Sequence, residues 1–439
     1  MLIYMHHFQK KNIHMSFVFI FLSVFLSFTL SCKVTTKDVE IIKSTPLVMS
    51  DDLFGTSPIS ASGEQIERIA WCGVQYDQLT KKRFDDFKNC GLTINYNYYQ
   101  NADQLEQVLN FSQEVGIKTI IHSSETDPNH PKLAQTIHRF KNHPALLGYS
   151  VMDEPQRNKN NFTGTIDEAI AHGKAIRALD PNEDHILYIT NNYIPLEDIQ
   201  YLDAGINRKI LSFDYYPTWP YNIAQGVYNS WFLATETEAN HAKKLGKKWW
   251  GFAVTAQHLK YPAATVANLR AQVFVNLAYG AQGIEYFTYS VPKGTDDYVN
   301  TPVNTNGDTT IFYTQLRNIN NEIKNLSFVF ANANVEWTRH YNYQKDDPAV
   351  SVTTSSKEPV TLPLQIKKIQ TSIPVLMALL SKNGDNYLVV VNRDFEKNVD
   401  TFVEVDSNVK RILKTGVAVN AEQHINIKPG DALIYTWKK

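Results

Sequence analysis

Short apolar segments alternate with longer amphipathic segments from Arg68 onward. The short segments are typical of buried strands, and the longer ones, with apolar residues at every third or fourth position, are typical of helices packed on a sheet. This alternation predicts βα units and a parallel sheet. The expected strands are 69–75, 92–98, 117–123, 146–152, 185–191, 208–214, 247–254 and 283–289. The expected helices include 102–115, 163–179, 230–245 and 265–279.

Glycines stand where several of these helices should end, which is the position of a left-handed C-cap. They are Gly91, Gly116, Gly246 and Gly280. Eight strands spaced in this way predict an α/β fold, a (β/α)8 TIM barrel, which we place at residues 66–330. One more helix, expected at 312–326, packs against this barrel.

A different pattern follows the barrel. Strand-like runs recur at short intervals, at 335–341, 349–354, 362–368, 374–381, 386–392, 400–405, 410–413 and 432–437. Asn383-Gly384-Asp385, between two of these runs, is a hairpin signal. Residues 331–439 are therefore expected to form a C-terminal all-β sandwich domain that supports the barrel.

The N-terminal segment has the features of an export signal. Lys10 and Lys11 precede an apolar run, 17–30, that ends at Ser31-Cys32. A cysteine directly after the break resembles a bacterial lipoprotein signal, so we expect Cys32 to be lipidated and the polar residues 33–65 to be a tether. An ordinary cleaved signal and an uncleaved anchor are the alternatives, although the run is shorter than the roughly 20 residues of a spanning helix. The chain is expected to be exported and held at the membrane only through this N-terminal lipid.

Composition excludes some classes of partner. The formal net charge is −1 and no long basic run is present, so nucleic acid is not expected to bind. No phosphate loop or Gly-rich nucleotide fingerprint is present, and no cofactor is expected. Cys72 and Cys90 form no CxxC or Cys/His cluster, so we expect two buried small residues and not a zinc site.

Polar side chains stand at the C-terminal ends of nearly all the predicted strands. In a TIM barrel these ends meet at one face, where active sites are built. Amides, an imidazole, phenols and carboxylates in this arrangement suit a polyhydroxylated ligand. The residues expected to bind it are Gln75, Asn97, His122, Asp153, Asn192, Tyr216, Gln257 and Tyr289.

The strongest candidate for chemistry is Asp153-Glu154-Pro155, at the end of the fourth predicted strand. Glycoside hydrolysis needs two carboxyl groups, one of which stays protonated to donate to the leaving oxygen. We predict that Glu154 is this acid, because the neighbouring carboxylate of Asp153 would raise the pKa of one member of the pair. The alternative is that either residue only caps the segment that follows.

The second carboxyl group has two candidates. Asp214 repeats the design of an apolar strand, an acid and a proline stop, and we favour it. Glu285 lies on the eighth strand, early enough to be a buried structural acid that pairs with Arg270. Asp214, in turn, has the alternative of capping the next turn. A divalent metal held by His122, Asp153, Glu154 and Asp214 is a weaker reading, because no HxH or HExxH spacing supports it.

Three segments carry a resemblance to a known group of enzymes. Leu147-Gly148-Tyr149 through Pro155, Ser212 through Pro217, and Ala278 through Ile284 resemble the (β/α)8 glycoside hydrolases of clan A and the β-galactosidase-like barrels. The resemblance covers about residues 66–439 and implies that Glu154, at the end of the fourth strand, is the acid/base. It also implies a nucleophilic Glu at the end of the seventh strand, but Trp249 to Ala256 contains no carboxylate. With the lipoprotein signal, the chain looks like the secreted proteins of polysaccharide-utilising bacteria.

These observations lead to one expected function and two alternatives. We expect a glycoside hydrolase that acts on a polysaccharide or oligosaccharide, with Glu154 as general acid and Asp214 as second carboxylate. A non-catalytic carbohydrate-binding lipoprotein would explain the missing carboxylate on the seventh strand, and a scaffold barrel without ligand would not need the polar strand ends. Trp219, Tyr221 and Trp231 are either a sugar platform or packing residues.

Overall fold

The structure is a computed structural model that describes residues 64–157, 164–192, 195–217, 227–258, 261–295, 297–351 and 353–439. The predicted signal segment 1–32 with Cys32, nearly all of the predicted tether 33–65, and the residues Trp219 and Tyr221 lie outside the described residues. None of the helices formed by the described residues has the length and apolar character needed to cross a membrane.

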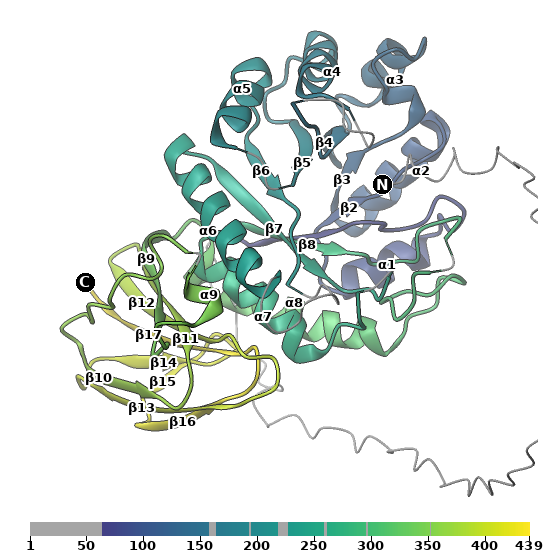
Figure 1. Cartoon of the computed structure of the whole chain (residues 1–439). Helices are drawn as coiled ribbons and strands as arrows, with labels where there is room; N and C mark the ends of the chain where they lie inside the picture. The colour runs from purple at the N-terminus through teal and green to yellow at the C-terminus, as the bar shows by residue number, and fades with distance from the viewer. Residues whose placement is uncertain are drawn as a thin grey trace, which may run out of the picture.

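Eight parallel strands close into a barrel in chain order, which confirms the predicted (β/α)8 fold (Figure 1). The strands are β1 (Glu67–Ala70), β2 (Ile94–Tyr96), β3 (Lys118–Ile121), β4 (Leu146–Asp153), β5 (Ile186–Asn191), β6 (Ile210–Phe213), β7 (Lys248–Val254) and β8 (Gly283–Phe287). The barrel closes through pairing of β1 with β8, where Ile69 aligns with Glu285.

Helices surround the barrel. They are α1 (Lys81–Asn89), α2 (Ala102–Val115), the 3-10 helix η3 (Ser124–Thr126), α3 (Leu133–Phe140), α4 (Ile166–Leu179), α5 (Leu196–Ile206), α6 (Val227–Leu245), α7 (Val266–Ala278) and α8 (Ile311–Phe330). Their ends follow local sequence signals. Asn101 caps the start of α2 by accepting from Gln104 N, and Gly116 ends it with a φ of 70°. Thr165 and Glu168 form a capping box at the start of α4.

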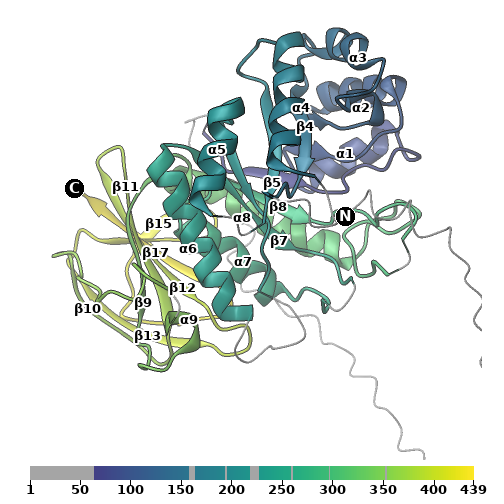
Figure 2. The same cartoon turned by 45° about the horizontal axis from the view of Figure 1, so that its top comes forward.

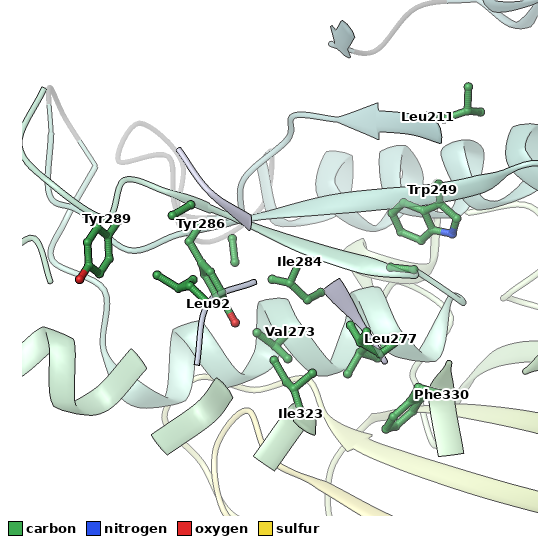
Figure 3. Packing of buried hydrophobic residues seen from close by; sticks show 14 of the residues in the cluster. Leu92, Leu211, Trp249, Val273, Leu277, Ile284, Tyr286, Tyr289, Ile323 and Phe330 are labelled. Carbon is green, nitrogen blue, oxygen red and sulfur yellow. The ribbon is translucent and has the colours of Figure 1, made fainter. Parts of the chain in front are cut away.

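The largest apolar core lies between the barrel wall and the helices (Figure 3). Ile284 and Tyr286 of β8 point away from the barrel interior, towards α7 and α8, where Val273 and Ile323 belong to the same core. The hydroxyl of Tyr286 donates to Asn320 Oδ1 of α8 at 2.7 Å. The eighth strand therefore alternates between this outer core and the interior of the barrel, which is what places Glu285 inside.

The C-terminal part is an antiparallel β domain of two packed sheets, as predicted. Its strands are β9 (Asn334–Tyr341), β10 (Ile366–Thr371), β11 (Val375–Lys382), β12 (Asp385–Asn392), β13 (Val399–Val405), β14 (Lys410–Ile412), β15 (Ala418–Asn420), β16 (His424–Ile427) and β17 (Ala432–Lys438). One sheet has the order β15-β14-β17-β12-β11-β9 and the other has the order β10-β13-β16. A separate apolar core lies between them. The predicted hairpin joins β11 to β12, with positive φ at Asn383 and Gly384.

The six-stranded sheet also packs on the barrel. Residues of its other face, including Ala378 and Val389, belong to the same core as the barrel helices. Figures 1 and 2 show these strands beside α6, α7 and α8, on one side of the barrel. The β domain is therefore continuous with the barrel core and stabilises one side of it.

Some predicted elements of the β domain were wrong. The expected strand 349–354 is replaced by α9 (Pro348–Ser351), because Asp347 accepts from Ala349 N at 3.0 Å and proline favours the first helical position. The strand predicted at 362–368 begins later, at Ile366, after Pro363. The short strands β15 and β16 were not predicted. Cys72 and Cys90 are both buried and free, as expected.

Candidate functional site

A bulge in β4 directs Asp153 into the barrel. The pairing of β4 with β5 skips Val151 between Ser150 and Met152. Val151 and Met152, although consecutive, both contact the outer core between barrel and helices. A bulge of this kind shifts the alternation of side-chain directions by one residue. Asp153 therefore faces the barrel interior, on the side of Ser150, where it accepts a hydrogen bond from the hydroxyl of Thr190.

Glu154 follows directly and has a left-handed backbone, with a φ of 47°. Its backbone N–H donates to Thr190 O at 3.1 Å and faces Thr190 Oγ1 at 3.3 Å. Asn192 Nδ2 donates to Glu154 Oε1 at 3.3 Å. Burial, together with the negative charge of Asp153, raises the pKa of Glu154 to about 7. A carboxyl group with this pKa is about half protonated at neutral pH and can donate a proton.

Asp214 lies directly after β6, on the same face of the barrel. Its backbone N–H donates to Asn191 O at 2.9 Å, which ties the end of β6 to the end of β5. Burial and then the charge of Glu154 raise the pKa of Asp214 well above its usual range. Each of the two carboxyl groups affects the ionisation of the other. Glu154 and Asp214 therefore titrate as a coupled pair, which keeps one proton more readily than it loses both.

Glu285 is fully buried inside the barrel on β8. Its Oε2 accepts hydrogen bonds from the hydroxyl of Tyr188 and, at 3.1 Å, from Trp71 Nε1. Its Oε1 has no hydrogen-bond partner among the described residues. Burial raises the pKa of Glu285 to about 7. The alternative in which Glu285 pairs with Arg270 was wrong, because Arg270 points outward and binds Glu322 and Asp431.

Aromatic rings fill the interior of the barrel around these acids. One apolar cluster combines side chains from most of the strands, and its aromatic members are Trp71, Tyr96, Tyr188, Tyr216, Trp250, Phe252 and Tyr261. The rings of Trp71 and Tyr96 are 4.5 Å apart between centroids in an edge-on arrangement. A low-polarity wall of this kind is the physical cause of the raised carboxyl pKa values.

Some of the residues predicted to bind a ligand lie together. Asn192 contacts Glu154, and Tyr216 packs on Phe252 in the interior cluster. His122 stacks on Tyr96, whose hydroxyl lies 3.3 Å from His122 Nδ1. Burial lowers the pKa of His122 to about 4, so its ring is neutral at physiological pH.

The other predicted binding residues have different surroundings. Gln75 and Asn97 are buried, and their amides donate to the backbone oxygens of Cys72 and Val74. The amide oxygen of Gln257 accepts from Asn300 in the loops after β7 and β8. Tyr289 belongs to the outer core, where its ring packs on Phe87 at 5.2 Å between centroids. The structure therefore does not bring Tyr289 to the acidic residues. Trp231 is buried against Phe232 and belongs to the same outer core.

Sequence reasoning missed three residues that hold the acids. Thr190 binds Asp153, and Tyr188 and Trp71 bind Glu285. A signal for two of them exists in the sequence, since Tyr188 and Thr190 are two apart on β5 and thus share a face. No such signal exists for Trp71, which lies just after β1.

The end of β7 carries no acid. Its last residue, Val254, is fully buried, and Thr255 donates its hydroxyl to Thr288 O at 2.8 Å. Among the residues that the structure describes, no group of three or more His, Cys, Asp or Glu side chains has the arrangement of a metal site. A surface hollow of about 230 Å³ lies between α4 and α5, near Arg177, and none of the predicted site residues lines it.

The sequence matches no protein-family model and no curated protein sequence. Solved structures do match the fold. A β-galactosidase from Bacillus circulans sp. alkalophilus aligns with a TM-score of 0.58 and 10% identity over 85% of this chain and 99% of that chain. A catalytic mutant of a GH42 β-galactosidase from G. stearothermophilus aligns with a TM-score of 0.59 and 9% identity over 87% and 99% of the two chains. An alpha-amylase from Geobacillus thermoleovorans aligns with a TM-score of 0.50 and 9% identity over 85% and 99%. The structure thus has the fold of the (β/α)8 glycoside hydrolases, the group that the sequence resembles.

Proposed function

We propose that this protein is a glycoside hydrolase that cleaves a polysaccharide or oligosaccharide, with Glu154 as general acid and Asp214 as second carboxylate. The observation that carries the proposal is the pKa of Glu154, raised to about 7 at the end of β4 beside a second buried acid. This chemistry requires one protonated and one ionised carboxyl group, and a pair that keeps one proton between its two members supplies both forms.

In the proposed reaction, Glu154 donates its proton to the oxygen of the leaving sugar as the glycosidic bond breaks. Asp214, in its ionised form, either attacks the anomeric carbon or removes a proton from an attacking water. Bound substrate would exclude water from Glu154 and Asp214. The interactions of both carboxyl groups with the reacting sugar would then be stronger, because charges interact more strongly in a less polar medium. Asn192, which donates to Glu154, and Tyr216, which follows Asp214 by two residues, are the nearest proposed ligand contacts.

A carbohydrate-binding protein without catalytic activity is the second candidate. The buried Val254 and Thr255 at the end of β7 favour it, because they leave no carboxylate at the position of the usual nucleophile. Aromatic and amide side chains would still bind sugar in this case. The two candidates differ in turnover and not in affinity.

The test is release of reducing sugar from a panel of plant and algal polysaccharides and their oligosaccharides. The purified mature chain is compared with Glu154→Gln and with Glu197→Gln, which removes an exposed carboxylate from the first turn of α5. Release by the wild type and by Glu197→Gln, but not by Glu154→Gln, supports the hydrolase. Binding to a glycan of the panel without release by any of the three proteins overturns it in favour of the second candidate.

We propose in addition that the protein is exported and anchored through a lipid on Cys32. The basic residues, the apolar run and the cysteine of the first 32 residues support this proposal. Membrane fractionation of cells that produce the full chain tests it, with Cys32→Ala expected to move the protein from the membrane to the soluble fraction. An equal distribution of both proteins would contradict it.

A further inference from the structure

His172 is a buried histidine of α4 with hydrogen-bond contacts at both ring nitrogens. Its side chain lies between α4, β4 and η3, and the residue is 3% exposed. Nδ1 lies 2.8 Å from the backbone oxygen of Val151, and Nε2 lies 2.8 Å from the backbone oxygen of Thr126. Both distances are those of good hydrogen bonds.

Both partners of the ring are acceptors. A carbonyl oxygen has no hydrogen to donate, so each of the two contacts requires an N–H on the ring. A neutral imidazole has only one N–H and would direct the lone pair of its other nitrogen at a carbonyl oxygen. The two contacts of His172 are therefore satisfied together only by the imidazolium form, in which both nitrogens donate.

The two carbonyl groups belong to segments that build the candidate site. Val151 is the additional residue of the β4 bulge and precedes Glu154 by three positions. This bulge turns Asp153 into the barrel. Thr126 ends η3, the turn that follows β3. By holding both carbonyl groups, the ring fixes the bulge against the neighbouring loop, and an ordered bulge keeps the two acids in their orientation.

Ionisable groups lie near the end of β3, on the turn that contains Thr126 and on elements that pack against α4. Near the end of β3, burial lowers the pKa of His122, and positive charge on His172 lowers it further. Burial raises the pKa of Asp127, and the same charge opposes that rise. Glu125 of η3 is paired with Lys132, and Asp198 of α5 is paired with Arg157. On β4, the group that contacts the ring is the backbone carbonyl of Val151. Asp153 and Glu154 lie further along the chain, at the end of this strand.

We propose that His172 is a positioning residue, an imidazolium that donates to both carbonyl groups and thereby orients Asp153 and Glu154. Its effect on catalysis rests on the proposed function, whereas its charge state does not. Removal of either N–H would release one carbonyl group and allow the bulge to move. Because a displacement of about 1 Å at a catalytic group costs on the order of 100-fold in rate, the effect on turnover should be large.

The charge state is tested by ¹⁵N NMR of the wild-type ring at neutral pH. The signals of His172 are assigned by their absence from His172→Gln or, if that variant does not fold, from His172→Asn. We expect both nitrogens to be protonated. One nitrogen with the shift of an unprotonated ring would overturn the proposal, whether or not the protein hydrolyses a glycan.

The positioning effect is tested on the glycan that the wild type cleaves. We expect His172→Gln, which can donate to only one of the two carbonyl groups, to lower kcat by about 10- to 100-fold with KM within about twofold. The control is His138→Gln, which removes an exposed histidine of α3 and should leave both constants unchanged. A folded His172→Gln variant with wild-type kcat and pH profile would overturn the proposal. If the wild type cleaves nothing, the proposed function fails and the NMR result alone decides the inference.

Discussion

The hydroxyl of Thr190 on β5 donates to Oδ1 of Asp153 on β4. The same oxygen of Thr190 lies 3.3 Å from the backbone nitrogen of Glu154. The side chain of Thr190 thus contacts both Asp153 and Glu154, and it does so from the neighbouring strand. The left-handed backbone of Glu154 is supported by these contacts, since a non-glycine residue in this region is disfavoured.

Thr190→Val should separate the effect of the Thr190 hydroxyl from the effect of its packing in the strand. Valine has nearly the same shape but no hydroxyl, so Asp153 loses the hydrogen bond from Thr190 while the strand stays packed. We expect kcat to fall by roughly 10-fold through misorientation of the acids. Thr190→Ser keeps the hydroxyl and should retain most of the activity. Equal losses in the two variants, measured by steady-state kinetics, would contradict this interpretation.

The pH dependence of hydrolysis should report the protonation of Glu154. Its pKa is raised to about 7, so activity should decline as the pH rises through about 7 and the acid loses its proton. Asp153→Asn removes a negative neighbour and should move this alkaline limb to lower pH by about 0.5 to 1 unit.

The control for this shift is Asp346→Asn, which removes an exposed carboxylate of the β domain. It should leave the profile unchanged. An alkaline limb that stays in place in Asp153→Asn would mean that the charge of Asp153 does not act on the proton donor.

Glu285 should make stability depend on pH. Its pKa is about 7 in the folded protein, against 4.5 ordinarily, so the folded state binds more protons than the unfolded state between these values. The stabilisation is complete below about pH 4.5 and is lost as the pH rises through about 7, by about 3 kcal/mol. Glu285→Gln cannot ionise, so the free energy of unfolding of the wild type relative to this variant should decrease over that interval. Denaturant titrations at pH 5 and pH 8 test this, and a constant difference would show that Glu285 stays in one form.

A second buried carboxylate connects the barrel to the β domain. Oε1 of Glu236 on α6 accepts from the backbone nitrogens of Thr354 and Ser355 at 2.8 Å, and Oε2 accepts from Ser356 N at 3.1 Å. Burial opposes ionisation, but hydrogen bonds from Ser356 and Thr354 lower the pKa of Glu236 below its usual value. Its stabilisation is therefore present at neutral pH and is lost as the pH falls into the acidic range.

Glu236→Gln should destabilise the protein by about 3 kcal/mol, because the new amide N–H₂ faces donors that then have no acceptor. The exposed Glu197→Gln is the matched control and should change stability by less than about 0.5 kcal/mol. Comparable unfolding midpoints for the two variants would contradict a stabilising contact at this interface.

The barrel could be predicted because its strands alternate with amphipathic helices, and this signal depends on local sequence alone. The β domain shows the limit of such reasoning. The run at 349–354 is rich in valine and threonine, which is typical of a strand, but Asp347 and Pro348 start a short helix there. A cap acts through one hydrogen bond and outweighs a weak preference for strand.

The orientation of polar residues was harder to predict than their place in the chain. Tyr289 follows a strand end as His122 does, but its ring faces the outer core. Asp153 faces inward only because Val151 is skipped in the pairing with β5. A bulge changes every later side-chain direction by one position, and the sequence carries no reliable sign of it.

The most direct test of Glu154 as general acid compares two leaving groups. The glycan cleaved by the wild type, or an oligosaccharide of it, has a poor leaving group that needs protonation, whereas an activated aryl glycoside of the same sugar does not. We predict that Glu154→Gln loses about 10²- to 10⁴-fold in kcat/KM on the natural bond and far less on the aryl glycoside. Equal losses on both substrates, or no cleavage of either by the wild type, would contradict the account.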